Sequence, residues 1–381
     1  MTRDRERVLL LTNIPSPYRI PLFNRLSGER DLGLRVLFLS SSEQNREWRV
    51  LKEQIKFDYT ILRGLHGFVK RWELPVHLNR DVFGAIHDYN PSTVIAGGYD
   101  NLAYWQAVAY SRLFRKRFIL WNGTTLLSTE RLNGPVGWLK RGFVASANAY
   151  VSYGTKAAEY LEALGAPRDN IHVGVNTVDM DWFCNSVKLH RNTSDFRQAR
   201  ARYPKLLVLY VGQLIKRKGI SILLVALRRL DDPNIGLLVV GSGPQEQELR
   251  LMCAEWGLQN VYFEGFREYG SLPYYYALAD VTVLPSLKEV WGLVVNESLA
   301  SGVYALCSES VGSGHDLIRE GWNGVVFTQG DTDQLATLLC DVKCRINDIR
   351  ARRETISEHA CREFSIAKSA QAFIDAIRMG Q

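Results

Sequence analysis

The segment "KLLVLYVGQLIKRKGISILLVALRRL" (residues 205–230) decides what fold we expect. It opens with a short apolar run, turns at Gly212, passes through a basic cluster and continues with apolar residues at helical spacing. An apolar strand without polar alternation is typical of a parallel sheet that helices cover on both faces. This unit therefore predicts an α/β protein with a doubly wound sheet.

The same alternation of short apolar runs and helix-length segments recurs along the whole chain. In the first half we predict strands at residues 7–12, 34–39, 93–97, 117–121 and 149–153. In the second half we predict strands at residues 205–212, 235–241, 260–265, 280–285, 303–307 and 324–327. A chain of 381 residues fits two domains of ordinary size. The polar stretch 176–195 is the best candidate for the linker between them.

The composition is that of an ordinary globular protein, with 46% hydrophobic and 23% charged residues. No uninterrupted apolar run approaches the roughly 18 residues that span a bilayer. The apolar stretch near the N-terminus is too short for a signal peptide, so we expect a cytoplasmic protein. Cys340 and Cys344 lie one helical turn apart, but no further Cys or His follows at zinc-like spacing, and we expect no metal site.

The net charge of +7 is concentrated in the first half, where residues 1–185 hold 24 Lys and Arg against 18 Asp and Glu. Two basic clusters, "GFVKRW" (67–72) and "RLFRKRF" (112–118), include aromatic residues. They indicate either a solvated basic face or a peripheral contact with an anionic membrane surface. No nucleic-acid-binding module is present, so nucleic acid is not an expected partner.

Glycine turns follow the predicted strands of the second half. Gly212 is followed by three cations, and Gly241 and Gly243 precede a helix that opens with acids. The cations are Lys216, Arg217 and Lys218. Ligands of doubly wound sheets bind outside the carboxyl ends of the strands, where such turns let backbone N–H groups approach. The cations beside one of these turns indicate an anionic ligand.

Two carboxylates stand eight positions apart in "PSLKEVWGLVVNESLASG" (285–302), directly after a predicted strand. These residues, Glu289 and Glu297, are either surface acids that aid solubility or parts of a ligand site. The glycine turns on the neighbouring strands favour the ligand site.

Four segments together resemble the donor domain of GT-B glycosyltransferases, specifically retaining family 4 (glycosyl transferases group 1). The segments are "VGQLIKRKG" (211–219), "VGSGPQEQEL" (240–249), "PSLKEVWGLVVNESLASG" (285–302) and "VGSGHDLIREGWNGVVF" (311–327). They follow the order and spacing of that family, and the two acids fit its E-x7-E motif. The first half resembles the acceptor domain more loosely, through "TNIPSPYRIPLFNRL" (12–26).

The resemblance implies a GT-B fold, with two doubly wound Rossmann-like domains facing a central cleft. Residues 1–178 would form the acceptor-binding domain, joined by a returning C-terminal helix at 364–381. Residues 179–363 would form the donor-binding domain.

The resemblance also implies a role for each acid. Glu297 would accept hydrogen bonds from both ribose hydroxyls of a sugar nucleotide, because a carboxylate has two oxygens and suits a vicinal diol. Glu289 would face the donor sugar and act in catalysis. Gly292 and Leu293 would offer backbone N–H groups to the diphosphate at a helix N-terminus.

The diphosphate also needs cations as the glycosidic bond breaks. Lys218 matches the catalytic lysine of the family, but Gln213 stands where the family usually carries an arginine. Leaving-group stabilisation would therefore depend on Lys218, with Lys216 or Arg217 as substitutes. No DxD-type acidic pair is present to bind a metal on the diphosphate, so metal-independent chemistry is expected.

The remaining site residues follow from the same resemblance. In the donor domain, Gly212, Gly241 and Gly243 would line the ligand, Phe266 and Arg267 would meet the nucleobase, and Gly312 and Asp316 would lie near the donor sugar. In the first domain, the candidate acceptor-binding residues are Ser16, Tyr18, Arg19, Asp100 and Asn122. Tyr18 is as consistent with packing, and Asp100 with capping the following helix. Asn122 stands where several relatives carry a His or Glu, so no catalytic base is expected.

These features predict a retaining enzyme that transfers a hexosyl or related group. The donor would be a UDP-, GDP- or dTDP-sugar, and the acceptor a glycan or lipid in polysaccharide, lipid-linked glycan or glycolipid synthesis. Two alternatives stay open, a GT-B sugar-nucleotide epimerase and a catalytically weak donor-binding homologue. No oligomeric state is predicted.

Overall fold

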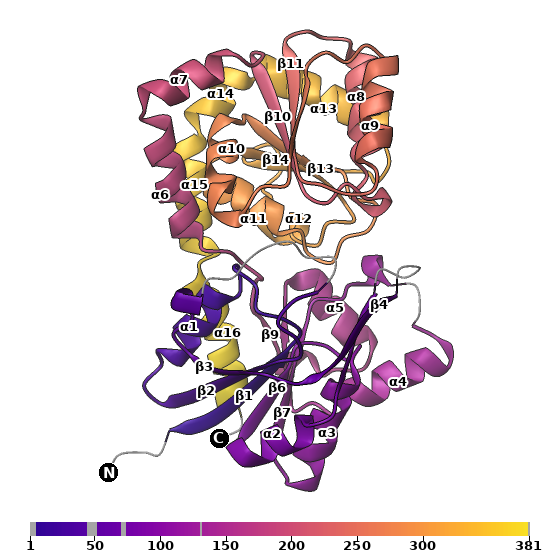
Figure 1. Ribbon diagram of the computed structural model, residues 1–381, viewed down its shortest axis with the longest axis vertical. Helices are drawn as coiled ribbons and strands as arrows, with labels where there is room; N and C mark the ends of the chain where they lie inside the picture. Colours follow the sequence, from indigo (N-terminus) through magenta and orange to yellow (C-terminus); the bar gives the residue numbers. More distant parts are fainter. Residues whose placement is uncertain (1–4, 44–51, 70–73, 130–131, 380–381) are drawn as a thin grey trace. The chain divides into compact units, whose positions relative to one another are not determined.

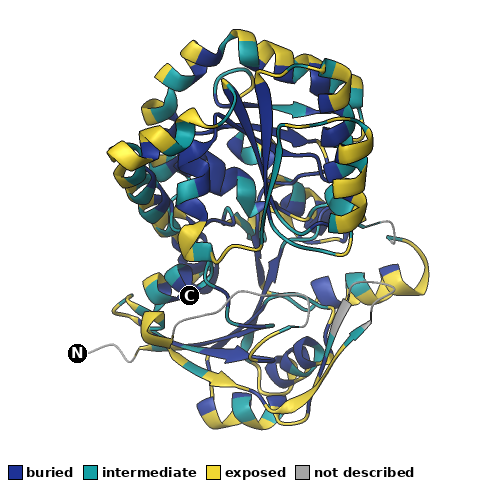
Figure 2. Ribbon diagram, turned by 45° about the horizontal axis from the view of Figure 1, so that its top comes forward, coloured by how far each residue is buried: buried dark blue, intermediate teal, exposed yellow. Residues whose placement is uncertain are grey.

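The computed structural model describes residues 5–43, 52–69, 74–129 and 132–379. The chain divides into two compact units (Figure 1). Unit 1 comprises Met1–Asn176 and Ile366–Gln381, and unit 2 comprises Thr177–Ser365. Each unit is built on one parallel sheet covered by helices, and the central strands are almost entirely buried (Figure 2). The prediction of two doubly wound α/β units is confirmed.

Unit 1 contains a seven-stranded parallel sheet in the order β3-β2-β1-β6-β7-β8-β9. The strands are β1 (Glu6–Thr12), β2 (Leu32–Phe38), β3 (Asp58–Ile61), β6 (Thr93–Ala96), β7 (Arg117–Asn122), β8 (Ala149–Ser152) and β9 (Ile171–Val173). All five strands predicted for this half are confirmed. The sequence did not indicate β3 and β9, because both are short edge strands with few buried positions.

A separate antiparallel hairpin, β4 (Gly64–Val69) and β5 (Leu74–Asn79), was also not predicted. The basic cluster at 67–72 falls here, but its residues 70–72 lie outside the described ranges.

The helices of unit 1 include the C-terminal helix of the chain. They are α1 (Ile20–Ser27), α2 (Val82–Tyr89), α3 (Leu102–Leu113), α4 (Gly134–Val144), α5 (Thr155–Ala163) and α16 (Ile366–Arg378). Helix α16 packs on α1, β8 and β9. The Arg117 guanidinium donates hydrogen bonds to the carbonyl oxygens of Ala376 and Ile377, both at 2.9 Å, and so satisfies the last turn of α16.

Unit 2 contains a six-stranded parallel sheet in the order β12-β11-β10-β13-β14-β15. The strands are β10 (Leu206–Val211), β11 (Ile235–Val240), β12 (Val261–Gly265), β13 (Val281–Leu284), β14 (Tyr304–Ser308) and β15 (Gly324–Phe327). All six predicted strands are confirmed. From β10 the chain first builds outward to β12 and then returns to add β13 on the other side. The strand order therefore reverses between β10 and β13, and ligands of open α/β sheets bind at the carboxyl ends of such a pair.

The helices of unit 2 cover both faces of this sheet. They are α6 (Met180–Arg191), α7 (Ser194–Ala201), α8 (Ile220–Leu230), α9 (Glu246–Glu255), α10 (Leu272–Leu278), α11 (Leu293–Ala300), α12 (Gly314–Leu317), α13 (Thr332–Cys344), α14 (Ile346–Ala351) and α15 (Arg353–Glu363). Within the described ranges, no helix combines the length and the apolar character that crossing a membrane requires.

The chain passes from unit 1 to unit 2 at Asn176–Thr177, inside the stretch 176–195 predicted as the linker, but most of that stretch is helix α6. The carboxylate of Asp179 accepts a hydrogen bond from the Trp182 N–H at 3.0 Å and caps the helix. Phe183 and Val187 are buried on one face of the helix. The polar residues that suggested a linker occupy the rest of this amphipathic helix.

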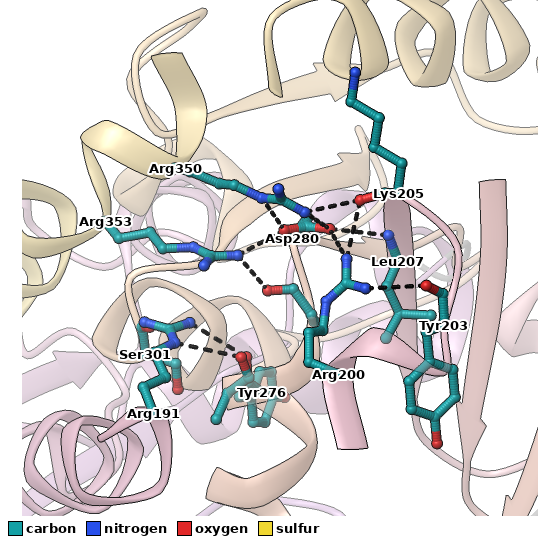
Figure 3. A network of polar contacts seen from close by, with 12 residues as sticks. Arg191, Arg200, Tyr203, Lys205, Leu207, Tyr276, Asp280, Ser301, Arg350 and Arg353 are labelled. Atoms are coloured by element: carbon teal, nitrogen blue, oxygen red, sulfur yellow. Dashed lines mark hydrogen bonds and ion pairs between the residues drawn. The ribbon is translucent and has the colours of Figure 1, made fainter. Parts of the chain in front are cut away.

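A buried carboxylate fixes the amino end of β13 (Figure 3). Asp280 has no exposed surface and pairs with three guanidinium groups at 2.7–2.8 Å, those of Arg200, Arg350 and Arg353. Burial acts to raise the pKa of Asp280, but the three cations outweigh it and hold the pKa below its usual value. This cluster ties α7, α14 and α15 to the sheet, at the edge opposite to the carboxyl ends of the strands.

Candidate functional site

Two glycine turns pack backbone to backbone at the carboxyl edge of the unit 2 sheet. A Cβ on Gly241 would lie 1.9 Å from the Gly212 oxygen, and a Cβ on Gly243 would lie 2.5 Å from the Leu214 oxygen. The Leu214 N–H donates to the Ser242 oxygen at 2.8 Å. Glycine is therefore required at both positions of the β11 turn, and main chain forms this part of the edge.

The basic turn after β10 is attached to the loop that follows β13. Residues Lys216–Lys218 form a single 3₁₀ turn that ends at Gly219, which has φ 67°. A Cβ on Gly219 would lie 2.1 Å from the Pro285 oxygen. The N–H groups of Leu287 and Lys288 both donate to the Arg217 oxygen, at 2.8 and 3.2 Å. These contacts hold the cationic turn against the loop that carries Glu289.

Lys218 and Glu289 form an ion pair between the two loops. Their side chains are only 14% and 12% exposed, and the Ser286 hydroxyl lies 3.4 Å from the same carboxylate oxygen. Burial acts to raise the pKa of Glu289, but the charge and hydrogen bond of Lys218, together with Arg217, hold it below its usual value. Glu289 is therefore an anion at neutral pH.

The loop before α11 leaves the N-terminus of that helix without a side-chain cap. Gly292 occupies the N-cap position with φ 90°, and Leu293 is the first helical residue. The Ser313 hydroxyl donates to the Gly292 oxygen at 3.0 Å, and a Cβ on Gly312 would lie 2.5 Å from the Val290 oxygen. The turn after β14 thus supports this loop, and the helix N-terminus favours an anion.

Glu297 lies in the second turn of α11 and is 6% exposed. Its carboxylate accepts a hydrogen bond from the Tyr276 hydroxyl at 2.7 Å. Burial raises the pKa of Glu297 to about 7, and the tyrosine bond offsets only part of this effect. The group therefore changes charge near neutral pH.

Arg191 positions both helices that meet at Glu297. Its guanidinium lies 3.2–3.5 Å from the carbonyl oxygens of Tyr276, Ala277 and Ser301 (Figure 3). These carbonyls belong to the end of α10 and the residue after α11. Sequence reasoning missed Arg191 and Tyr276, although the run "LPYYYALAD" places several tyrosines just before β13.

The other predicted donor residues lie on the same edge of the sheet. Phe266 and Arg267 follow β12, and Phe266 is 39% exposed. Arg267 pairs with Glu264 at 2.8 Å, so its charge has a local partner. Asp316 lies in the short helix α12, after β14.

The predicted residues of unit 1 gather partly around Tyr153. The Arg19 guanidinium donates to the Thr12 hydroxyl at 2.7 Å and to the Tyr153 hydroxyl at 2.5 Å. It also lies 4.4 Å from the centre of the Trp121 ring. Ser16 is buried, and its hydroxyl has no hydrogen-bond partner among the described residues. Tyr18, the residue before Arg19, is half-buried.

Asn122 and Asp100 follow β7 and β6. Asn122 is buried, and its side-chain amide donates to the Thr124 oxygen at 3.1 Å, so it shapes its own turn. Asp100 is exposed, and the N-cap position of α3 belongs to Asn101. The alternative that Asp100 caps this helix is therefore wrong.

Direct contacts connect the turns of unit 2 to one another, but they do not join all the residues that were predicted for the site. The β10 turn contacts both the β11 turn and the β13 loop, and the β13 loop contacts the β14 turn. Glu289 and Glu297 have separate partners, Lys218 and Tyr276. Among the described residues, no three His, Cys, Asp or Glu side chains are arranged to hold a metal.

Comparison with known proteins places these features in a family. Residues 192–343 match the model of the family described as glycosyl transferases group 1. This range contains the basic turn, the glycine turns and both acids.

Two curated relatives match part of the chain. An uncharacterized glycosyltransferase of Methanocaldococcus jannaschii is 29% identical over 180 residues, which cover 47% of this chain and 46% of the relative. A D-inositol 3-phosphate glycosyltransferase of Thermomonospora curvata is 31% identical over 221 residues, which cover 54% of this chain and 50% of the relative. The chain thus spans about half the length of the curated relatives it matches.

A solved structure matches nearly all of both chains. Anabaena HepE, crystallised in complex with UDP, has a TM-score of 0.76 and 17% sequence identity over 97% of this chain and 99% of HepE. Residues 192–343 therefore match the glycosyl transferases group 1 family, and the chain as a whole has the GT-B fold.

Proposed function

We propose that the chain is a retaining glycosyltransferase that moves a hexosyl or related group from a nucleotide diphosphate sugar to a glycan or lipid acceptor. It would act in the cytoplasm, in polysaccharide, lipid-linked glycan or glycolipid synthesis. The observation that carries the proposal is the Lys218–Glu289 ion pair. It lies at the reversal point of the sheet, inside the segment that matches the group 1 family.

In the proposed donor complex, the uncapped N-terminus of α11 binds the diphosphate. The backbone N–H groups near Gly292 and Leu293 would donate to phosphate oxygens, and the helix dipole would favour their charge. Glu297 would accept hydrogen bonds from the ribose hydroxyls. The UDP bound to HepE supports a nucleotide ligand in this fold.

Lys218 would stabilise the leaving diphosphate. When the diphosphate binds, Lys218 gains a second anionic partner, and Glu289 can turn toward the hydroxyls of the donor sugar. As the bond between the anomeric carbon and the phosphate oxygen breaks, that oxygen gains charge and takes the proton of the acceptor hydroxyl. The acceptor oxygen then bonds to the anomeric carbon on the same face, so the anomeric configuration is retained. Electrostatic stabilisation and positioning would supply the catalysis, without a metal.

Unit 1 would bind the acceptor, with residues 1–178 and 364–381 forming the acceptor domain and residues 179–363 the donor domain. The proposed acceptor residues are Ser16, Tyr18, Arg19, Asp100 and Asn122. The unpartnered Ser16 hydroxyl and the exposed Asp100 support this assignment, because both offer polar groups at one end of the unit 1 strands.

The test is nucleotide release from UDP-, GDP- and dTDP-sugars, measured with and without acceptor pools and in the presence of a chelator. We expect release that requires acceptor, survives chelation and gives a product with the donor's anomeric configuration. Lys218→Ala should lower kcat at least about a hundredfold, the usual effect of losing a transition-state charge contact. Lys343→Ala is the matched control, because it breaks the Lys343–Asp232 ion pair elsewhere in unit 2.

Three outcomes would contradict the proposal. Epimerised donor without transfer would favour a sugar-nucleotide epimerase. Donor binding without turnover on any acceptor would favour a binding protein. Equal activity of the Lys218 and Lys343 variants would remove Lys218 from the mechanism.

A further inference from the structure

Helix α4 of unit 1 carries large apolar side chains that are exposed to water. Val136, Trp138 and Leu139 are 42%, 75% and 59% exposed. Other positions of the helix are already packed, because Phe143 and Val144 are buried in the core of unit 1. The exposed apolar residues are therefore not needed to fold the unit.

Helices α3 and α4 are neighbours in unit 1 (Figure 1). Residues of both helices line a groove of about 830 Å³. Trp105 and Val108 line it from α3, and Trp138 and Leu139 line it from α4. Arg112 lies at the same groove, where its guanidinium donates to the Ser146 hydroxyl at 3.0 Å. We call the six residues Trp105, Val108, Arg112, Val136, Trp138 and Leu139 the α4 surface.

The segment of sequence that contains α3 and α4 is strongly basic. Between Asp100 and Glu159 the sequence has eight Lys and Arg and a single acid, Glu130, which lies outside the described residues. The oxygens that accept hydrogen bonds from Arg112 and Arg141 belong to Ser146 and Leu132 and are uncharged. No carboxylate among the described residues compensates these two cations.

We propose that the α4 surface docks on an anionic lipid bilayer. Trp138 and Leu139 would enter the interface between headgroups and acyl chains, which tryptophan prefers because its ring is apolar and its N–H is polar. Arg112 would extend its charged end to lipid phosphates. The attachment would be peripheral, through the side of one short helix.

The chemistry favours a bilayer over a protein partner or a second copy of the chain. An interface between copies would place the basic surroundings of one α4 surface against those of another, and like charges repel. An anionic bilayer neutralises these charges without needing a complementary shape. The proposal is independent of the proposed enzyme activity, because no donor-site residue belongs to the α4 surface.

The experiment is sedimentation of the full chain with vesicles of phosphatidylcholine alone or mixed with phosphatidylglycerol. We expect binding to the mixed vesicles that weakens with added salt, and little binding to phosphatidylcholine. Trp138→Ser should weaken binding by roughly tenfold or more, through loss of its buried apolar area. Arg112→Gln should weaken it about fivefold, the effect of one basic residue near an anionic surface.

Matched controls separate the α4 surface from general exposure. Leu251 is 64% exposed on α9 of unit 2, so Leu251→Ser should bind vesicles like the wild type, whereas Leu139→Ser should bind more weakly. Equal binding by the two leucine variants, or equal binding to neutral and anionic vesicles, would overturn the proposal. So would a Trp138→Ser variant that loses self-association in sedimentation velocity but keeps vesicle binding, which would make the surface an interface between copies. Nucleotide release without lipid should be the same in all four variants.

Discussion

Replacing Glu297 by glutamine should be more favourable for the stability of the protein in alkaline solution than in acid. The buried carboxyl has a pKa of about 7, against an ordinary value of 4.5. Between these two values the folded state keeps the proton that the unfolded state has lost. Wild-type stability therefore falls as the pH rises from 4.5 to 7 and is level above pH 7.

The size of the effect follows from the shift in pKa. A shift from 4.5 to about 7 corresponds to about 3 kcal/mol of lost stability above pH 7. Glutamine is neutral and has nearly the same shape, and its amide oxygen can still accept the Tyr276 hydrogen bond. The variant should not lose this stability above pH 7. Its unpaired amide group, however, should cost about 1–3 kcal/mol. The change with pH in the difference in free energy of unfolding between variant and wild type is therefore a better test than its value at one pH.

The assay is urea unfolding of the wild type and the variant at several pH values from 5 to 8. The difference in free energy of unfolding should shift in favour of Glu297→Gln by about 2.5 kcal/mol between pH 5 and pH 8. Glu255→Gln, on the exposed end of α9, should show no such shift. If the difference in free energy of unfolding is the same at pH 5 and pH 8, Glu297 is not a buried carboxyl that keeps its proton in the folded state.

The same group should make donor affinity depend on pH if it binds ribose as proposed. Hydroxyl groups donate to the ionised carboxylate, so binding should strengthen as pH rises through 7. With a pKa of about 7, the Kd of the sugar nucleotide should be about tenfold higher at pH 6 than at pH 8. Calorimetric titration that gives the same Kd at both values, with the stability result intact, would contradict the ribose contact but not the pKa.

Three further substitutions test other parts of unit 2. Asp280→Asn leaves three partly exposed guanidinium groups without their buried carboxylate and should cost about 3–5 kcal/mol in urea unfolding, against at most about 1 kcal/mol for Asp333→Asn in an exposed pair; equal losses would argue against the cluster. Gly219→Ala and Gly257→Ala both place alanine at φ near 67°, but only the first meets a backbone oxygen, so it should be the more destabilising by more than about 1 kcal/mol. Tyr276→Phe removes the bond that lowers the pKa of the α11 carboxyl, so the pH at which the stability curve levels off should rise above 7; an unchanged levelling point would count against that bond.

The sequence predicted most of the fold because the central strands are continuous apolar runs. It missed β3 and β9, since edge strands with few buried positions leave no such run. It also took the stretch containing α6 for a linker, because one buried face on a polar helix gives a weak signal.

The site was predictable in its backbone but not in its side-chain partners. Glycine turns mark the carboxyl edge because the turns pack too closely for a Cβ, as at Gly241. The partner of Glu289, by contrast, stands 71 residues away, and the partner of Glu297 stands 21 residues away. Such contacts depend on strand order, which motif spacing does not contain.

The return of α16 to unit 1 has a consequence for synthesis on the ribosome. Unit 2 is a continuous segment, complete once Ser365 has emerged, whereas unit 1 lacks a helix until the last residues are made. Until then the Trp121 ring lacks its contact with Phe373, and Arg117 lacks the carbonyls that it binds. We therefore expect unit 2 to finish folding before unit 1. Nascent chains stalled before residue 366 should contain an incomplete unit 1, which chaperones would recognise.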